Sequence, residues 1–166
     1  MRLHIVLVEP EIPGNTGNIA RLCAATGMEL HLVKPLGFSV EDKYLKRAGL
    51  DYWHLVKVSY HENFAEVAGI FAGHSMYFCS TKAKRAYSEV NYTPKDVLVF
   101  GKETAGLPEE ILAAHWENTV RIPMIHAARS LNLSNAVAVV AYEALRQQNF
   151  AALEQTGDGL HIQRKG

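Results

Sequence analysis

The loop FGKETAGLP, residues 100–108, carries two glycines at the spacing of a Walker phosphate loop, directly after the apolar run DVLVF. A Walker loop continues with Lys and then Ser or Thr after its second glycine, because these side chains hold phosphate and magnesium. Here Leu107 and Pro108 follow Gly106, so we do not expect a nucleoside triphosphate site. The glycines either permit tight turns or let the backbone approach another ligand closely.

A second group of polar residues lies at the start of a helix predicted over residues 134–148. It consists of Ser130, Asn132, Ser134 and Asn135. Short polar side chains cap helices or form turns, and beside a glycine loop they can also bind a small polar ligand. The predicted helix is apolar on nearly every side between residues 136 and 141, which is typical of a helix buried all round. We therefore expect part of its surface to contact a partner subunit.

A third group, NTGNIAR at residues 15–21, combines amide side chains with an arginine near the start of a helix predicted over residues 17–27. Backbone N–H groups are unpaired at a helix N-terminus, and Arg21 shares a face with Asn18, three residues earlier. This combination predicts an anion site that suits a phosphate. A capped helix with a surface arginine is the alternative.

The elements that must position these groups alternate along the chain between apolar runs and helical periodicities. This pattern indicates an α/β fold with a mostly parallel sheet and helices on both faces. In such sheets ligands bind at the carboxyl ends of the strands, where the three polar groups would meet. The predicted strands are residues 3–8, 29–33, 53–58, 75–79, 96–100 and 119–122, and the further predicted helices are 39–49, 64–71 and one that opens at Pro108.

Composition bounds the class of protein. The chain has 166 residues, of which 48% are hydrophobic and 20% charged, as in a globular domain. We expect one domain over residues 1–150 and a polar, loosely ordered tail over residues 151–166. There is no signal-peptide pattern and no apolar run long enough to span a membrane. Only two cysteines are present, which argues against a disulfide framework or a zinc site and suits the cytoplasm.

The formal net charge is zero, so a nucleic-acid partner would require segregated positive charge. Two basic clusters occur, and each is either a solvated surface or an RNA contact. His31 and His54 lie in strand patterns and are expected to be packed residues or residues of a sheet edge. His126, in the loop after residue 122, is the one candidate general base among the histidines. The clusters are Lys43, Lys46 and Arg47, and Lys82, Lys84 and Arg85.

Taken in order, the three polar groups resemble the motifs of the SPOUT class of RNA methyltransferases, and most closely the small tRNA 2′-O-methyltransferases of the TrmL or YibK branch. The motifs are N-T-G-N-x-x-R at 15–21, F-G-x-E-x-x-G-L-P at 100–108, and R-I-P-M at 121–124 followed by R-S-x-N-L-S-N-A-V at 129–137. The similarity extends to about residue 148. Gly14 and Lys102 stand where proline is common in that branch.

The resemblance implies a C-terminal trefoil knot and a homodimer whose sites use residues of both subunits. It also implies methyl transfer from S-adenosylmethionine, without a metal, to the ribose 2′-hydroxyl of the wobble nucleotide, cytidine or uridine 34, of tRNA. Another tRNA position, ribosomal RNA, or a non-catalytic RNA-binding module with the same fold are the alternatives.

The resemblance assigns roles to individual residues. The implied catalytic residues are Arg21 and Asn18. The implied cofactor-binding residues are Cys79, Gly101, Glu103, Gly106, Ile122, Met124, Ser130, Leu131, Asn132 and Asn135. The implied substrate-binding residues are Asn15, Arg21, Lys43, Lys46, Arg47, Lys82 and Arg129. Because a guanidinium hardly ever deprotonates, we expect Arg21 to bind the phosphate beside the target ribose, while that phosphate or a nearby group accepts the proton.

Overall fold

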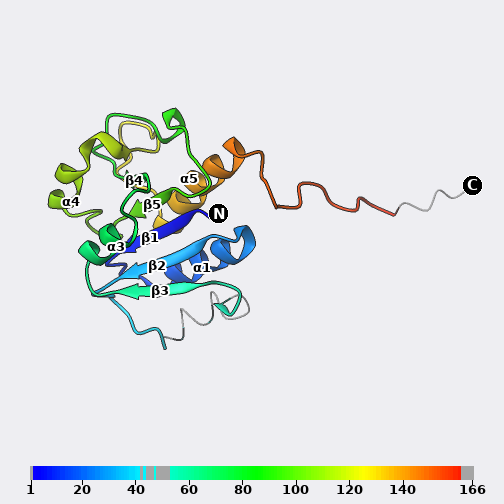
Figure 1. The fold of residues 1–166 in the computed structure, drawn as a ribbon, viewed down its shortest axis with the longest axis horizontal. Helices are drawn as coiled ribbons and strands as arrows, with labels where there is room; N and C mark the ends of the chain where they lie inside the picture. Colours follow the sequence, from blue (N-terminus) through cyan, green and yellow to red (C-terminus); the bar gives the residue numbers. More distant parts are fainter. Residues whose placement is uncertain (1, 42, 44–46, 48–52, 162–166) are drawn as a thin grey trace, which may run out of the picture.

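The computed structural model describes residues 2–41, 43, 47 and 53–161, and its six strands form one sheet (Figure 1). Every adjacent pair of strands is parallel, which confirms the predicted parallel sheet. The order across the sheet is β3-β2-β1-β5-β4-β6. The strands are β1 (His4–Val8), β2 (Glu29–Val33), β3 (Val58–His61), β4 (Met76–Cys79), β5 (Val97–Phe100) and β6 (Thr119–Val120).

Helices cover both faces of the sheet, as predicted (Figure 1). On one face lie α1 (Pro13–Thr26) and α5 (Leu133–Gln147), and on the other lie α3 (Phe64–Ile70) and α4 (Glu109–Ala114). Two short 3-10 turns, η1 (Tyr87–Glu89) and η2 (Trp116–Asn118), connect the later elements.

Alternate residues of each central strand supply two separate cores. In β1, Ile5 and Leu7 pack with α1 and α5, whereas Val6 and Val8 pack with α3 and α4. Side chains alternate between the faces of a strand, so a strand covered on both sides must be apolar throughout. This explains the near-continuous apolar runs, and each fully buried side chain contributes about 1.5–3 kcal/mol.

Two predicted strand boundaries are wrong. Residues 53–58 were predicted as a strand, but β3 begins only at Val58, and a turn in which the Val56 N–H donates to the Trp53 carbonyl precedes it. The Trp53 and Val56 side chains pack on the core, so their apolar character reflects burial in a turn, whereas Leu55 is exposed. His54 is accordingly exposed in the turn.

The last strand is also shorter than the predicted 119–122 segment, because β6 ends at Val120. Arg121 leaves the sheet and pairs instead with the chain ahead of η1. Its N–H donates to the Arg85 carbonyl at 2.8 Å, and its own carbonyl accepts from the Tyr87 N–H at 2.8 Å. Most of the helix predicted at 39–49, with Lys46, lies outside the described residues.

Helix α5 is less enclosed than its composition suggested. One row of its side chains is exposed, including Val139 (38%) and Tyr142 (44%). After α5, Leu153 still packs on the core, and the exposed chain then runs away from the domain (Figure 1). Within the described parts of the chain, no helix combines the length and apolar character needed to cross a bilayer.

Candidate active site

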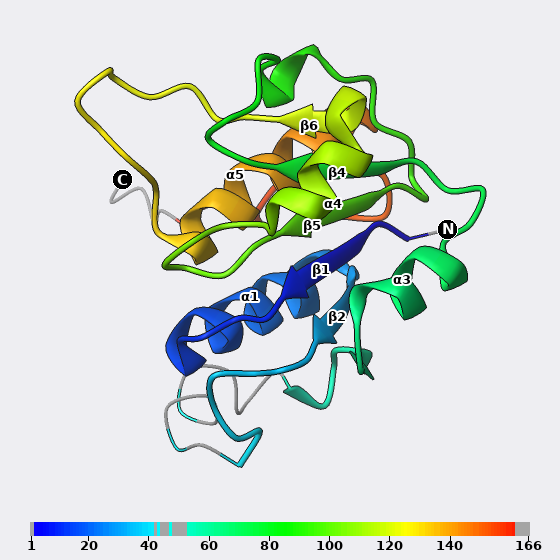
Figure 2. The ribbon, with the colours of Figure 1, turned by 90° about the vertical axis from the view of Figure 1, so that its left-hand side faces the viewer.

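A cavity of about 420 Å³ opens at the carboxyl ends of β4, β5 and β6. Its volume falls in the range of roughly 300–1,000 Å³ typical of small-molecule sites. The walls come from the segments that follow these strands, and the long segment between β6 and α5 arches outward beside it (Figure 2). Parallel strands thus bring together the loops after β4, β5 and β6, which are far apart in the sequence, and two of these loops carry the polar groups at 100–108 and 130–135 that the sequence predicted to meet.

The β5–α4 loop closes tightly on itself at Gly101. A Cβ atom added there would lie 2.0 Å from the Gly106 carbonyl carbon and 2.2 Å from the Leu107 nitrogen. The closure is held by a hydrogen bond from the Gly106 N–H to the Lys102 carbonyl at 2.9 Å, and Gly106 adopts a positive φ of 68°. Both glycines are therefore required by the turn itself, because an L side chain would clash or be strained there.

Glu103 connects this loop to the start of α1. Its carboxylate accepts the backbone N–H groups of Glu11 at 2.8 Å and Ile12 at 3.1 Å, and the Asn15 side-chain amide at 3.3 Å. In return, the Glu11 carboxylate accepts from the Thr104 hydroxyl at 2.6 Å and its N–H at 3.1 Å. These two hydrogen bonds hold the pKa of Glu11 below its usual value.

The sequence predicted an anion-binding site at the start of α1. The anion found there is the protein's own Glu103 carboxylate. The N–H groups leading into that helix are occupied by the Glu103 carboxylate, so a substrate phosphate does not bind them. Because Pro13 opens the helix, four residues before the predicted start, Arg21 also lies well beyond its first turn.

Asn132 extends the same network to the third loop. Its Nδ2 donates to the Asn15 Oδ1 at 3.1 Å, while its Oδ1 accepts from the Ser134 N–H at 2.9 Å and the Asn135 N–H at 3.4 Å and so caps α5. Glu103, Asn15 and Asn132 form a continuous chain, here called the three-loop clasp. The clasp fixes the first motif against two of the three loops that line the cavity, those after β5 and β6.

The thiol of Cys79 forms part of the cavity wall, where burial raises its pKa to about 12. A neutral thiol is a poor nucleophile, so the cavity does not favour chemistry through a covalent cysteine intermediate. Near the rim, Lys82 forms an exposed ion pair with Glu109 at 3.3 Å.

Residues 2–142 match the SpoU rRNA methylase family. The chain belongs to this family. The match spans all three loops and most of α5, so the clasp and the cavity both lie within the SpoU region.

Individual SpoU relatives agree over nearly the whole chain. The tRNA (cytidine(34)-2′-O)-methyltransferase of Methylovorus glucosotrophus is 55% identical over 148 residues, covering 89% of this chain and 96% of its own. A solved structure described as giving insight into 2-OH methylation of C/U34 on tRNA has 46% identity and a TM-score of 0.86, with 90% and 97% coverage. An AdoMet-bound rRNA methyltransferase from Sinorhizobium meliloti has 26% identity and a TM-score of 0.78, covering 87% of this chain and 56% of that one.

Most of the predicted cofactor residues line the SpoU cavity. These are Cys79, Gly101, Glu103, Gly106, Ile122, Met124, Ser130 and Leu131. Asn132 and Asn135 instead lie at the N-terminus of α5, where the clasp and the cap engage them. Two predicted substrate residues, Lys82 and Arg129, also line the cavity.

The other predicted site residues lie elsewhere. Asn18 and Arg21 are exposed on α1, and among the described residues those that line the cavity include none from α1. Asn15 is buried within the clasp, at 6% exposure. Lys43 and Arg47 are exposed, and Lys46 is outside the described residues.

Sequence reasoning found Ile122, Met124 and Leu131 but missed the part of the apolar cavity wall that the helices supply. Leu112 from α4 and Leu133 and Ala136 from α5 reach its wall, but an apolar residue in an amphipathic helix reads as ordinary core. Thr104 was missed for a different reason. Its hydroxyl donates to the Glu11 carboxylate, and the two residues are too far apart in the sequence for a local pattern to reveal the contact.

The clasp predicts a measurable cost for replacing Glu103 by Gln. The amide NH₂ of Gln would face backbone N–H donors, and hydrogen bonds to a charged acceptor contribute about 1.5–3 kcal/mol. We expect Glu103→Gln to lower the melting temperature by roughly 3–12 °C and to weaken S-adenosylmethionine binding. Circular dichroism and calorimetry would measure the two effects. The control is Glu109→Gln, which changes an exposed carboxylate paired with Lys82. Equal melting temperatures and equal cofactor affinities in the two variants would contradict the proposed role of the clasp.

Proposed function

We infer that this chain is an S-adenosylmethionine-dependent tRNA methyltransferase that acts on the ribose 2′-hydroxyl of the wobble nucleotide, cytidine or uridine 34. The observation that carries the inference is the convergence of the second and third motif loops on one cavity, with the first motif joined to both through the clasp, in a chain of the SpoU family. The names of its C34-modifying relative and of the C/U34 structure support the substrate, and the AdoMet-bound relative supports the cofactor.

The cavity suits an adenosyl group. Side chains such as Leu107, Ile122 and Leu133 offer an apolar wall for adenine, and the loop around Gly101 presents backbone beside polar side chains such as Ser130. S-adenosylmethionine would be held by these residues and would supply a methyl group already activated on a positively charged sulfur. Because no proton or hydride must be taken from the donor, positioning supplies much of the rate, and no metal is proposed for the transfer.

Arg21 and Asn18 complete the site from a second subunit. Both are exposed on α1 and away from the cavity walls of their own chain. The neighbouring exposed row of α5 includes the apolar surfaces of Val139 and Tyr142. Pairing of two copies through α1 and α5 would cover this surface and carry the Arg21 of one subunit toward the cavity of the other. We therefore propose a homodimer in which Arg21 holds the phosphate beside the target ribose.

A basic groove beside the cavity suits the tRNA backbone. It shares Thr81, Met124 and Arg129 with the cavity and adds Lys84 and Arg121 to the cationic side chains. We propose that this groove holds phosphates flanking the wobble nucleotide, together with Lys82 and the 43–47 cluster. The catalytic domain would comprise residues 1–150 in the cytoplasm, with no membrane association.

The groove predicts steep salt dependence of tRNA binding. With four phosphate contacts, raising the salt from about 50 to about 200 mM should weaken binding roughly 50- to 150-fold. Lys84→Ala should make the slope of log affinity against log salt shallower by the amount that one phosphate contact contributes. Filter binding would measure this slope. Lys95→Ala removes the same charge from an exposed site outside the groove and should leave the slope unchanged; a flat wild-type response would exclude the groove.

The deciding experiment is transfer from labelled S-adenosylmethionine to unfractionated tRNA, with mass spectrometry of the digested nucleosides. A 2′-O-methylated pyrimidine mapped to position 34 is the expected product. Methylation of another tRNA position, or of ribosomal RNA alone, would retain the reaction and change the substrate. Cofactor and tRNA binding without any transfer would favour a non-catalytic RNA-binding module.

A further inference from the structure

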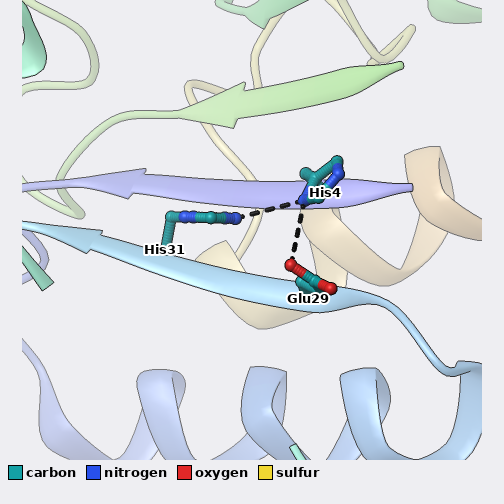
Figure 3. Close-up of side chains that lie close together, drawn as sticks. All are labelled: His4, Glu29 and His31. Atoms are coloured by element: carbon teal, nitrogen blue, oxygen red, sulfur yellow. Dashed lines mark hydrogen bonds and ion pairs between the residues drawn. The ribbon is translucent and has the colours of Figure 1, made fainter. Parts of the chain in front are cut away.

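A cluster of histidines and a carboxylate lies at the amino ends of the central strands, at the opposite end of the sheet from the cavity. His4 opens β1, and Glu29 and His31 lie on the adjacent β2. Their side chains point toward one another (Figure 3). The three donor atoms that they offer all lie within 4.8 Å of one another.

The contacts within the cluster compete for one atom. His4 Nδ1 lies 3.1 Å from His31 Nε2 and 3.6 Å from a Glu29 carboxylate oxygen. A neutral imidazole nitrogen is either a donor or an acceptor, so a single proton cannot make two full hydrogen bonds there. A cation placed among the three atoms would bind all of them at once.

We propose that His4, Glu29 and His31 form a binding site for a divalent transition-metal ion of the zinc class. Zinc binds histidine nitrogen and carboxylate oxygen at about 2.0–2.2 Å in a tetrahedron, which places neighbouring ligand atoms about 3.3–3.5 Å apart. The observed separations of 3.1 and 3.6 Å bracket that range. Two histidines and one glutamate supply three ligands, and water completes the tetrahedron.

His61 on β3 provides the outer support that metal-binding histidines require. Its Nε2 lies 3.0 Å from His31 Nδ1, so a proton on that Nδ1 leaves the Nε2 of His31 free to bind the ion. Such outer hydrogen bonds fix the tautomer and orientation of a ligand. Burial lowers the pKa of both His31 and His4, which is the direction that favours the neutral rings that bind metal ions.

The carboxylate supplies the negative charge that the ion needs. Glu29 now forms an ion pair with Lys57 at 3.4 Å, but the lysine side chain is 67% exposed while the glutamate is 16% exposed. Lys57 can therefore move into solvent when an ion takes its place. An ion bound here would tie β1 to β2 and stabilise the sheet without contacting the methyl-transfer site.

The test is calorimetric titration of Zn²⁺ into untagged, chelator-treated full-length protein, with melting temperatures recorded alongside. We expect one ion per chain and a rise of about 5–11 °C at a free zinc concentration of 100 times Kd. Glu29→Gln and His4→Gln should each weaken binding at least tenfold, and Co²⁺ should give the strong visible absorption of tetrahedral coordination.

The matched control is Glu109→Gln, which removes a carboxylate paired with a lysine at the other end of the sheet, and it should bind zinc as the unmodified chain does. The proposal is overturned if zinc does not bind at millimolar concentration. It is also overturned if binding is unchanged in both Glu29→Gln and His4→Gln. If either variant fails to fold by circular dichroism, the other decides.

Discussion

Gly101→Ala is expected to abolish S-adenosylmethionine binding and to lower the melting temperature by roughly 6–12 °C. The added methyl group would meet the backbone of Gly106 and Leu107 at 2.0–2.5 Å, and no side-chain rotation can relieve a clash with backbone. The loop must therefore open, which breaks the Gly106–Lys102 hydrogen bond and moves the floor of the cavity. Overpacking of this severity costs about 3 kcal/mol or more.

The control for this variant is Gly69→Ala in α3. A Cβ at Gly69 meets nothing within 4 Å, and alanine is favoured over glycine inside a helix by about 0.5–1 kcal/mol. Gly69→Ala should be at least as stable as the unmodified chain and should bind the cofactor normally. Calorimetry and thermal unfolding on both variants measure the difference. Normal cofactor affinity in Gly101→Ala would show that the loop closure is not needed for the cavity.

Arg21→Lys should lower the rate of methyl transfer by roughly 10- to 150-fold while leaving S-adenosylmethionine affinity within about twofold. The rate falls because a lysine does not reproduce the two-pronged hydrogen bonding of a guanidinium to phosphate, and hydrogen bonds to charged groups contribute about 1.5–3 kcal/mol. Cofactor affinity is retained because α1 does not supply the described walls of the cavity. Single-turnover kinetics and calorimetry measure the two quantities.

Arg2→Lys makes the same exchange at an exposed position just ahead of β1, at the other end of the sheet, and should not change the rate. Full turnover by Arg21→Lys would exclude the proposed two-pronged hydrogen bonding of the Arg21 guanidinium to the phosphate. Loss of cofactor affinity in that variant would instead mean that Arg21 approaches the cofactor directly.

The sheet could be predicted from the sequence because burial on both faces leaves an unmistakable apolar run. The β3 error shows the limit of that signal, since Trp53 and Val56 are apolar in order to cover the core from a turn. The helix start at Pro13 was missed because the polar residues of the first motif read as a loop. Asn15 is tolerated inside α1 because the clasp satisfies its side chain, and Asn18 because it is exposed.

The candidate site was predictable in its position and only partly in its contacts. Loops at the carboxyl ends of neighbouring strands must converge, so the cavity follows from topology. The partnership of Glu103 with Glu11 and Asn15 spans about ninety positions and leaves no local pattern. The His4–Glu29–His31 cluster was hidden likewise, because counting cysteines does not detect histidines spread over paired strands.

The pairing of β1 with β5 has a consequence for the growing chain on the ribosome. The centre of the sheet cannot form until Val97, the β5 partner of His4, has been synthesised. Translation at roughly 5–20 residues per second needs about 5–20 s to cover that interval. Until then the nascent apolar strand β1 has β2 on one side and an open edge on the other, the arrangement most prone to aggregation. The rate of elongation through β4 and β5 therefore sets how long the nascent chain is prone to aggregation.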